Sequence, residues 1–364
     1  MRILYTTTIG LTMIFFRGLV KQLIEAGHTV DIATNEDDYQ VDDFYRQLGC
    51  KVFQVNWQRS PLKTSNLKAI KKLKSIISDG NYDIVHCHTP VAGFCTRYAC
   101  RKLRKQGLRV FYTAHGFHFF SGAPAKNRLL YYPIEKISAH WTDVLITINK
   151  EDYQLACKSL KAKQIKYVPG VGIDVDRIKN TKVNRAEKRK EFGFSEKDFV
   201  FMSTGELSKR KNHQTVVKAL NKINDDSLKY LIVGEGAEEK NLITLSQNLC
   251  VDDRVVFAGY RKDVAELLKS ADAFAFPSTQ EGLPVALMEA IAAGLPVVCS
   301  KIRGNVDLLK DGFDFVYDCN DSDGFASGMQ RIIDGEYKPE NVVDINLFDT
   351  GKVNENMLSI YNLK

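Results

Sequence analysis

The 364-residue sequence lacks several features that would place it in a familiar class. No apolar run approaches the roughly 18 residues that cross a bilayer, and the most apolar stretch, residues 285–299, is interrupted by Glu289. The nine prolines and the 44% of hydrophobic residues argue against a disordered or fibrous chain. The segment that begins Met1-Arg2-Ile3 contains no apolar signal-peptide core. We therefore expect a folded protein that is neither exported nor membrane-spanning.

The cysteines do not suggest a disulfide framework. None of the eight belongs to a C-x-x-C motif, and most lie in apolar segments. They are Cys50, Cys87, Cys95, Cys100, Cys157, Cys250, Cys299 and Cys319. Disulfide frameworks are typical of short secreted chains, whereas cytoplasmic thiols stay reduced. We expect reduced, mostly buried cysteines in a cytoplasmic protein.

Two familiar nucleotide-binding motifs are also absent. The dinucleotide fingerprint needs G-x-G-x-x-G after a strand, but Gly234-Glu235-Gly236 is followed by Glu239 at the third glycine position. The loop that begins at Gly205 contains Lys209-Arg210-Lys211 without the second glycine and the Lys-Ser/Thr pair of a Walker P-loop. These absences argue against a dehydrogenase and against an ATPase.

Charge is distributed unevenly along the chain. The net charge of +7 divides into +12 for residues 1–170, with 25 Lys and Arg against 13 Asp and Glu, and −5 for the rest, with 26 against 31. The basic excess is concentrated in residues 59–74 and 97–109. Solvated helix faces explain such stretches, and so does attraction to anionic lipid headgroups, with Leu67, Ile70 and Leu73 available to insert. No zinc-finger spacing, basic zipper or RNP-like strand points to nucleic acid.

Short β-branched runs alternate with amphipathic stretches, which predicts βαβ units and parallel sheets. Strands are expected at residues 2–7, 29–33, 51–55, 84–86, 110–113 and 144–148, then at 199–203, 230–233, 255–257, 273–276 and 297–299. The polar segment 179–197 is expected to be a linker with a short helix. The fold class is α/β, with two Rossmann-like doubly wound domains facing a cleft. Their expected bounds are 1–170 and 171–345, and a C-terminal helix in 346–364 crosses back to the first domain.

The most informative segment, residues 277–298, places a carboxylate in the loop after a buried strand. Proline is favoured in the first helical turn, so we expect a helix to begin near Pro284. Glu281 precedes that helix and Glu289 lies eight residues further on, a little over two turns into it. Carboxylates accept hydrogen bonds from vicinal hydroxyls, and the free N–H groups of a helix start bind anions. Taken alone, the pair also fits a helix cap and a helix-face glutamate.

The wider context of this segment resembles a known family. The E-x7-E pattern of Glu281 and Glu289 is similar to the signature of the retaining glycosyltransferases of family 4, which have the GT-B fold. Further matching segments are V-G-E-G at 233–236, G-Y-R-K-D-V at 259–264, S-A-D-A-F at 270–274 and S-K-I-R-G-N at 300–305. In the first half they are G-H-T-V at 27–30, D-I-V-H-C-H-T-P at 83–90, Y-T-A-H-G-F-H-F-F at 112–120 and V-P-G-V-G-I-D at 168–174.

The resemblance implies roles for individual residues. Glu281 would contact the donor sugar, Glu289 the ribose hydroxyls, and Lys211 the diphosphate, whose charge grows as the glycosidic bond breaks. Many relatives carry an arginine where this chain has Glu206, so Lys209 or Arg210 is left to replace it. Other donor-binding positions are Gly10, Asn212, Gly234, Tyr260, Arg261, Ser278, Gly282, Leu283, Pro284 and Val285. Gly10 would let the backbone approach the diphosphate, and the loop after Gly259 would read the base through its backbone.

Histidines gather in the first half. The resemblance places His115 beside the reacting sugar as a catalytic residue, and we assign His88 and His118 to the acceptor side. His86 and His88 flank Cys87 on one strand face and raise a zinc alternative, but no further ligand cluster is visible. Asp174-Val175-Asp176 has the letters of a metal-binding D-x-D motif but lies in the interdomain turn. We therefore expect neither a metal nor a bound cofactor.

The resulting hypothesis is a retaining glycosyltransferase. It would transfer a hexosyl or N-acetylhexosaminyl group from a nucleotide-diphosphate sugar, expected to be UDP-linked, to a hydroxyl of a glycan or lipid-linked acceptor in capsule or other surface-polysaccharide synthesis. It would bind reversibly at the anionic inner face of the membrane. The alternatives are a nucleotide-sugar epimerase of the related fold and a non-catalytic nucleotide-sugar-binding protein. Transfer assays with a panel of nucleotide sugars distinguish the three.

Overall fold

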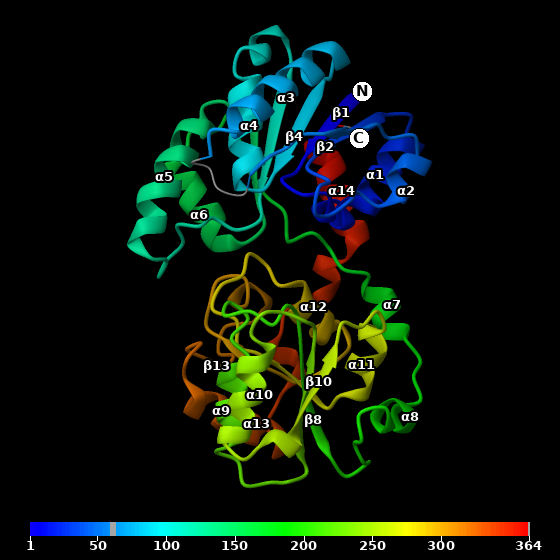
Figure 1. The fold of residues 1–364 in the computed structure, drawn as a ribbon, viewed down its shortest axis with the longest axis vertical. Coiled ribbons are helices and arrows are strands. Elements are labelled where there is room, and N and C mark those ends of the chain that lie inside the picture. The colour runs from blue at the N-terminus through cyan, green and yellow to red at the C-terminus, as the bar shows by residue number, and fades with distance from the viewer. Residues whose placement is uncertain (59–62, 363–364) are drawn as a thin grey trace. The chain divides into compact units, whose positions relative to one another are not determined.

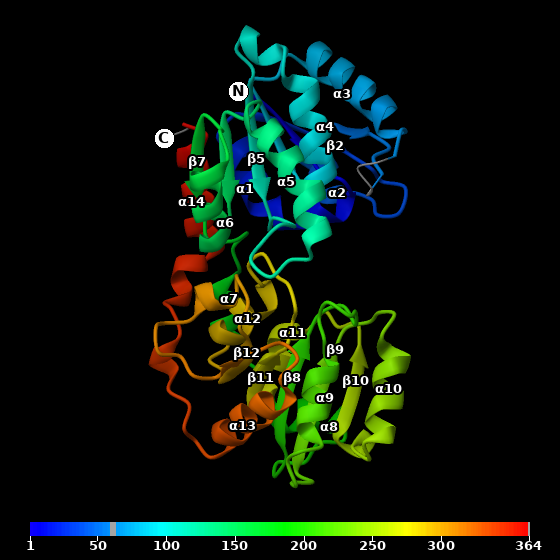
Figure 2. The same ribbon diagram turned by 90° about the vertical axis from the view of Figure 1, so that its left-hand side faces the viewer.

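A computed structural model describes residues 1–58 and 63–362. The chain folds into two compact units (Figures 1 and 2). Unit 1 contains Met1–Gly172 and the C-terminal segment from Thr350, and unit 2 is Ile173–Asp349. The boundaries therefore lie slightly beyond the expected positions 170 and 345. The segment from Thr350 packs with the first half of the chain, as its predicted crossing requires.

Unit 1 is built on a parallel sheet with the strand order β3-β2-β1-β4-β5-β6-β7 in the described residues. The strands are β1 (Arg2–Thr6), β2 (Thr29–Thr34), β3 (Val52–Gln54), β4 (Ile84–His88), β5 (Arg109–Ala114), β6 (Val144–Thr147) and β7 (Gln164–Tyr167). The helices are η1 (Gly10–Phe16), α1 (Arg17–Glu25), α2 (Asp43–Gln47), α3 (Asn66–Gly80), α4 (Pro90–Cys100), η2 (Leu103–Gln106), α5 (Ala125–Ala139), α6 (Lys150–Ser159) and α14 (Thr350–Ile360).

Alternation along the strands of unit 1 creates two apolar faces. Ile3 and Tyr5 of β1 pack with α1, α2 and α14 in one cluster, whereas Leu4 packs with α3 and α4 on the other face. The helices α5 and α6 cover the same second face near β5 and β6. Because helices cover both faces, the central strands β1, β4, β5 and β6 are almost entirely buried.

Unit 2 repeats this architecture with the strand order β10-β9-β8-β11-β12-β13 in the described residues. The strands are β8 (Phe199–Thr204), β9 (Leu228–Val233), β10 (Val255–Gly259), β11 (Ala273–Phe276), β12 (Val297–Ser300) and β13 (Val316–Tyr317). The helices are α7 (Val175–Asn180), α8 (Arg185–Lys190), α9 (Gln214–Leu220), α10 (Glu239–Asn248), η3 (Asp252–Arg254), α11 (Val264–Ser270), α12 (Val285–Ala292), η4 (Val306–Leu308), α13 (Ser322–Ile333), η5 (Pro339–Asn341) and η6 (Ile345–Phe348). The group α9, α10 and α13 lies on one face of the sheet, and α11 and α12 lie on the other (Figures 1 and 2).

Both sheets reverse their strand order next to their first strand. In unit 1 the reversal separates β1 from β4, and in unit 2 it separates β8 from β11. Loops that leave the carboxyl ends of such neighbouring strands run in opposite directions and leave a crevice where ligands bind. The expected fold class of two doubly wound units is confirmed, and it directs attention to these two positions.

Two short edge strands, β7 and β13, were not predicted. Each has few residues and half-exposed side chains, so neither forms the continuous apolar run that identifies a buried strand. The expected linker 179–197 is also more ordered than predicted. Arg189 of α8 is buried, and its guanidinium bonds to Asp272 and to the carbonyls of Ser270 and Asp198. This segment is therefore an integral part of unit 2.

The two basic stretches have different environments. On α3 the side chains of Lys68, Lys71, Lys72 and Lys74 are exposed. The expectation that Leu73 and Ile70 are free to insert into a membrane is wrong, because Leu73 is fully buried and Ile70 packs against the same core. Leu67 is 66% exposed. Arg59 lies outside the described residues.

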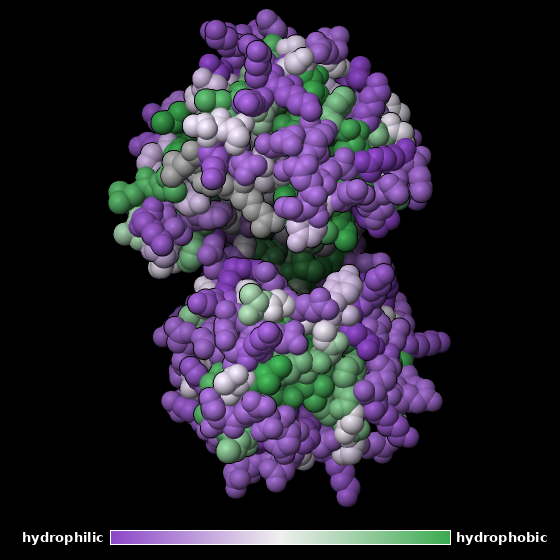
Figure 3. All heavy atoms as spheres, in the orientation of Figure 1, coloured by the Kyte–Doolittle hydropathy of each residue, from purple (hydrophilic) through white to green (hydrophobic). Residues whose placement is uncertain are grey.

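The second stretch, residues 97–109, is only partly exposed. Arg97 is fully buried and forms an ion pair with Glu135 at 2.8 Å, and Arg104 pairs with Asp143 at 2.6 Å. Lys102 and Lys105 are exposed. Hydrophilic side chains cover most of the molecular face shown in Figure 3. Among the described residues, no helix combines the length and apolar character that a bilayer crossing needs.

Candidate active site in two crevices

Lys211 and Glu281 meet at the strand-order reversal of unit 2. Lys211 follows β8 and Glu281 follows β11, and the ammonium of Lys211 lies 2.8 Å from Oε1 of Glu281. Both side chains are 11% exposed. The two residues that the sequence assigned to the diphosphate and to the donor sugar thus form one ion pair in the crevice.

Arg210 joins this pair from the same loop. Its Nη1 donates to Oε1 of Glu281 at 2.8 Å and to the carbonyl of Gln280 at 3.1 Å. The backbone N–H of Thr279 donates to the carbonyl of Arg210 at 2.8 Å, which fastens the two loops together. The side chain of Lys209 is exposed. Of the two candidates for the second cation, Arg210 is the one that reaches Glu281.

The charges at this position favour an anionic ligand. Burial lowers the pKa of Lys211, and the neighbouring Glu281 opposes that shift. The ammonium also lies 4.9 Å from the ring centroid of Phe276, a cation–π distance. Two cations share one carboxylate oxygen, so a diphosphate could take over their hydrogen bonds at little cost in reorganisation.

Glycines bring the neighbouring loops into close contact. An added Cβ on Gly234 would lie 1.9 Å from the carbonyl oxygen of Gly205, and one on Gly304 would lie 2.5 Å from the carbonyl oxygen of Gly282. An added Cβ on Gly205 would lie 3.0 Å from Cε of Lys211. The predicted donor positions Gly234 and Gly282 are therefore points of close backbone packing around Lys211 and Glu281.

Asn212 also acts on the loops. Its buried amide donates to the carbonyl of Pro277 at 3.2 Å and to that of Cys319 at 2.6 Å, and its backbone has a φ of 56°. The side chain was expected to contact the donor, but it holds the Lys211 loop against the loop after β11. Asn212 therefore positions the loop that carries Lys211.

The remaining residues of the E-x7-E segment line the start of α12. Leu283 and Pro284 are buried, and Pro284 precedes Val285, the first residue of the helix. Ser278 is fully buried, and its Oγ has no hydrogen-bond partner among the described residues. Arg303 donates from Nε to the carbonyl of Glu281 at 3.1 Å. The loop that carries Glu281 is thus held from both sides.

Glu289 is the fifth residue of α12, because the helix begins at Val285. It therefore lies in the second turn, and the expectation of more than two turns was wrong because the three residues between Glu281 and Val285 are not helical. Burial raises the pKa of Glu289, and Arg177 partly offsets the shift. A partly buried carboxylate of this kind is suited to accept hydroxyl hydrogen bonds.

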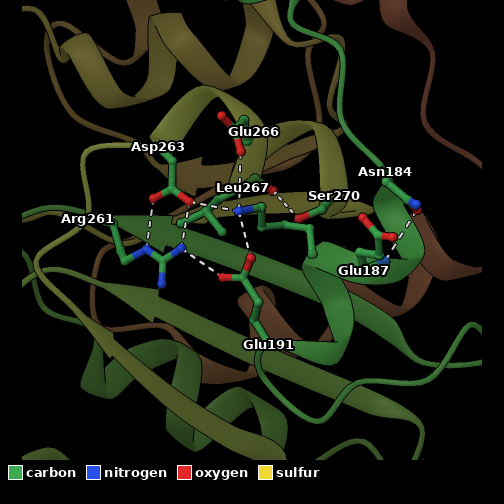
Figure 4. Close-up of polar contacts among 9 residues, drawn as sticks. Asn184, Glu187, Glu191, Arg261, Asp263, Glu266, Leu267 and Ser270 are labelled. Atoms are coloured by element: carbon green, nitrogen blue, oxygen red, sulfur yellow. Dashed lines mark hydrogen bonds and ion pairs between the residues drawn. The ribbon is translucent and has the colours of Figure 1, made fainter.

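The loop after β10 carries Tyr260 and Arg261. Tyr260 is 68% exposed, and its backbone N–H donates to Glu235 at 3.3 Å. The guanidinium of Arg261 is engaged by Asp263 and by Glu191, each contact being 2.8 Å or shorter (Figure 4). The side chain of Arg261 is therefore occupied within the protein.

This arginine belongs to a wider ion network (Figure 4). The ammonium of Lys188 on α8 contacts Glu191, Asp263 and Glu266 at 2.8, 3.0 and 3.2 Å. Hydrogen bonds to these carboxylates, Glu191 first, raise the pKa of Lys188. The network fastens the loop after β10 to α8 and α11.

In unit 1, three histidines lie side by side at the ends of β4 and β5. Nδ1 of His88 lies 3.1 Å from Nε2 of His115, and the rings of His86 and His88 are 4.2 Å apart. Burial lowers the pKa of His115 to about 4 and that of His86 to about 3. His88 is fully buried. Its expected contact with an acceptor is wrong for this structure, because its ring faces other side chains.

His118 lies in a separate pocket at the strand-order reversal of unit 1. This pocket, about 210 Å³ in volume, is lined by His118, Tyr131 and the hydroxyl-bearing residues Thr8, Thr12 and Thr89. The rings of His118 and Tyr131 are 4.5 Å apart. Aromatic faces and hydroxyls suit a sugar or another hydroxyl-rich ligand.

Only glycine fits at position 10, because the backbone of unit 1 packs closely against it. An added Cβ would lie 2.4 Å from the carbonyl oxygen of Tyr39 and 2.8 Å from the backbone nitrogen of Val41. The interpretation that glycine makes room here for a diphosphate is wrong, because the chain's own backbone occupies that space.

Two family descriptions match the chain in succession. Residues 14–177 match "Glycosyltransferase Family 4", and residues 184–346 match "Glycosyl transferases group 1". EpsD of Bacillus subtilis, which is named as a glycosyltransferase, is 38% identical over 294 residues covering 79% of this chain and 76% of EpsD. The chain belongs to this glycosyltransferase family.

A second relative is named for its substrates, and a structure of similar fold contains a bound nucleotide. The UDP-Gal:alpha-D-GlcNAc-diphosphoundecaprenol alpha-1,3-galactosyltransferase of Escherichia coli is 32% identical over 290 residues, covering 75% of this chain and 74% of the relative. The crystal structure of Anabaena HepE in complex with UDP has a TM-score of 0.78 at 19% identity and covers 100% of both chains. The predicted family and GT-B fold are confirmed.

Two residues with central contacts in this glycosyltransferase, Tyr361 and Lys188, were not found from its sequence. Tyr361 follows α14, and its hydroxyl lies 2.5 Å from Nδ1 of His86 and 2.7 Å from the hydroxyl of Tyr5. Lys188 was part of the expected linker. No local motif surrounds either residue, so only the tertiary contacts reveal them.

Both nitrogens of His86 are occupied, since Nε2 lies 2.8 Å from the hydroxyl of Thr113 and Nδ1 contacts Tyr361. This arrangement does not fit the zinc alternative for His86 and His88. Within residues 1–58 and 63–362, no group of three or more His, Cys, Asp or Glu side chains is arranged to hold a metal ion.

Proposed function

We propose that this glycosyltransferase moves a hexosyl or N-acetylhexosaminyl group from a UDP-sugar to a hydroxyl of a glycan or lipid-linked acceptor, with retention of configuration. The observation that carries the proposal is the Lys211–Glu281–Arg210 cluster at the strand-order reversal of unit 2. The UDP bound to HepE and the UDP-galactose donor in the name of the Escherichia coli relative support a UDP-linked donor.

In this proposal the cations act on the leaving group. The diphosphate gains negative charge as the bond to the anomeric carbon breaks, and fixed cations in a partly buried site stabilise that charge. Lys211 supplies the inner cation, and Arg210 supplies the second one in place of the arginine expected at Glu206. Glu281 is then released from both cations and accepts hydroxyl hydrogen bonds from the donor sugar, while Glu289 binds the ribose.

The acceptor is proposed to bind unit 1. The pocket of His118, Tyr131 and three threonines lies at the strand-order reversal, where α/β units bind ligands. The Escherichia coli relative is named for an acceptor linked to diphosphoundecaprenol. A lipid-linked acceptor of this class would bring the glycosyltransferase to a membrane surface, and the exposed lysines of α3 support reversible binding to anionic lipid.

A transfer assay with purified protein tests the donor assignment. UDP-glucose, UDP-galactose, UDP-N-acetylglucosamine and UDP-N-acetylgalactosamine are compared with their GDP and ADP counterparts, and a diphospho-undecaprenol-linked sugar serves as acceptor. Transfer or slow hydrolysis of one UDP-sugar is expected. Interconversion of sugars without transfer would instead identify an epimerase, and tight binding without turnover of any donor would identify a non-catalytic protein.

A further inference from the structure

The histidine cluster of unit 1 contains one nitrogen that finds no partner. The side chain of His88 is fully buried, with 0% of its surface exposed to solvent. Its Nε2 has no hydrogen-bond partner among the described residues. Its Nδ1 faces Nε2 of His115 at 3.1 Å. The ring stacks on Tyr5 at 5.5 Å and 15°, and the ring of Phe16 lies 4.3 Å away. These two aromatic contacts hold the imidazole of His88 in one orientation.

The facing nitrogens can share only one proton. Burial holds the pKa of His88 well below its usual value and that of His115 at about 4, so both rings are neutral near pH 7. A neutral imidazole carries one N–H and one lone pair. Either Nδ1–H of His88 donates to His115, or Nε2–H of His115 donates to His88.

The two arrangements leave different atoms unpaired. If His115 donates, His88 must carry its own proton on Nε2, where a buried N–H would have no acceptor. If His88 donates, its Nε2 holds only a lone pair, which is then an unpaired acceptor among the described residues. Buried backbone N–H groups without partners are rarer in proteins than under-satisfied backbone acceptors, and we apply the same preference to the imidazole. The second arrangement is therefore favoured.

We propose that His88 is a positioning residue that fixes His115 as the Nδ1–H tautomer, so that His115 offers a hydrogen-bond donor to the substrate and not a proton-accepting nitrogen. The tautomer follows from contacts within unit 1 alone. That the free Nδ1–H serves a sugar nucleotide or an acceptor rests on the proposed function.

A variant of His86 is the control that distinguishes the proposed role of His88 from a general packing role. It lies on the same strand and is equally buried, but its two nitrogens contact Thr113 and Tyr361 and neither is bonded to His115. His86→Leu therefore removes a buried histidine without removing the bond to His115. His88→Asn keeps an N–H near the position of Nδ1, and His88→Leu removes it.

The direct test is a long-range proton–nitrogen NMR spectrum of the full-length protein with ¹⁵N-labelled histidine. Assignment uses His115→Gln, which deletes the His115 signals. Wild type, His88→Asn and His86→Leu are expected to show His115 protonated on Nδ1, whereas His88→Leu is expected to show a mixture or the Nε2–H form. A wild-type His115 protonated on Nε2 would overturn the proposal, and this result does not depend on the folding of either His88 variant.

Transfer rates give the second readout. We expect His88→Leu to lower kcat/KM by about tenfold or more, the order of loss seen when the partner that orients a metal-bound histidine is removed. His88→Asn is expected to retain more activity than His88→Leu. Equal losses of kcat/KM in His88→Asn and His88→Leu would show that His88 contributes only by packing, which would contradict the proposal. If wild type transfers no sugar, the proposed function fails while the NMR result still decides the tautomer.

Discussion

The ammonium of Lys211 lies 2.8 Å from Oε1 of Glu281, although 70 positions separate the two residues in the chain. The parallel pairing of β8 with β11 brings their carboxyl ends together, and each residue sits in the loop that follows its strand. Arg210 bonds to the same oxygen. Two cations therefore share one carboxylate oxygen at the strand-order reversal of unit 2.

Glu281→Ala is expected to lower the transfer rate by about 100-fold or more, the scale of losing one charged group that acts on the reacting centre. Binding of UDP is expected to persist, because Lys211 and Arg210 remain. Initial-rate assays and calorimetric titration with UDP measure the two effects. Glu196→Ala, at an exposed position of unit 2, is the control. Unchanged turnover in Glu281→Ala would refute the assignment.

Lys211→Ala is expected to raise KM for the donor and to lower kcat together, each by about tenfold or more, because the diphosphate is charged before the reaction and gains charge during it. Steady-state kinetics with varied donor concentration separates the two parameters. Lys218→Ala, which removes an exposed lysine from α9, is the control. A change confined to acceptor affinity would contradict the role given to Lys211.

Arg210→Ala is expected to reduce kcat/KM by about tenfold, and Lys209→Ala by less than about twofold, because exposed charges without a fixed partner contribute little. The comparison uses the adjacent cation of the same loop as its control, so net charge is matched. Arg210→Lys should recover part of the activity. A larger loss in Lys209→Ala would show that Lys209 supplies the second cation.

Replacing Lys68, Lys71, Lys72 and Lys74 with glutamine is expected to weaken binding to vesicles that contain anionic lipid. Each basic residue near such a surface contributes about 1 kcal/mol, and salt screens the attraction over about 8 Å at physiological ionic strength. Co-sedimentation at several salt concentrations measures the effect.

The matched control for the membrane experiment is the loss of four exposed lysines from unit 2, namely Lys182, Lys190, Lys197 and Lys310. This variant has the same net charge and should bind like wild type. Equal binding of wild type to neutral and anionic vesicles, or binding to neither, would contradict membrane docking. The α3 lysines would then be explained as a solvated helix face.

Unit 1 is expected to lose stability as the pH falls from 7 to 5. Burial lowers the pKa of His86 to about 3 and that of His115 to about 4, below the usual 6.5. The unfolded chain therefore takes up protons first as the pH falls, and the free energy of unfolding decreases by about 1.4 kcal/mol per pH unit for each such histidine below its unfolded pKa.

Both tryptophans, Trp57 and Trp141, belong to unit 1, so urea titration followed by tryptophan fluorescence at pH 7, 6 and 5 reports on this unit. His86→Gln is expected to flatten the pH dependence by one histidine's share. His140→Gln, at an exposed position, should leave the dependence as it is. Equal stability at pH 7 and pH 5 would contradict the burial argument.

The local sequence pattern was sufficient to predict the architecture and to find the segments that contain the candidate site residues. Runs such as residues 199–202 are apolar throughout because helices cover both faces of the sheet, and that property is visible in the sequence. The start of α12 was predicted from Pro284 in the segment of Glu281 and Glu289. The edge strands β7 and β13 were missed because half-exposed strands of a few residues have no distinctive pattern.

The sequence by itself determined the two parallel α/β units, the family and the residue types at the carboxyl ends of the strands. Tertiary structure alone decided that Arg210 reaches Glu281, that His88 faces His115, and that Tyr361 contacts His86. It also decided that Leu73 is buried and that Gly10 packs on residues 39–41. Periodicity depends on neighbours a few positions away, whereas these contacts join residues from separate elements, and their distances follow from how the helices pack on each sheet.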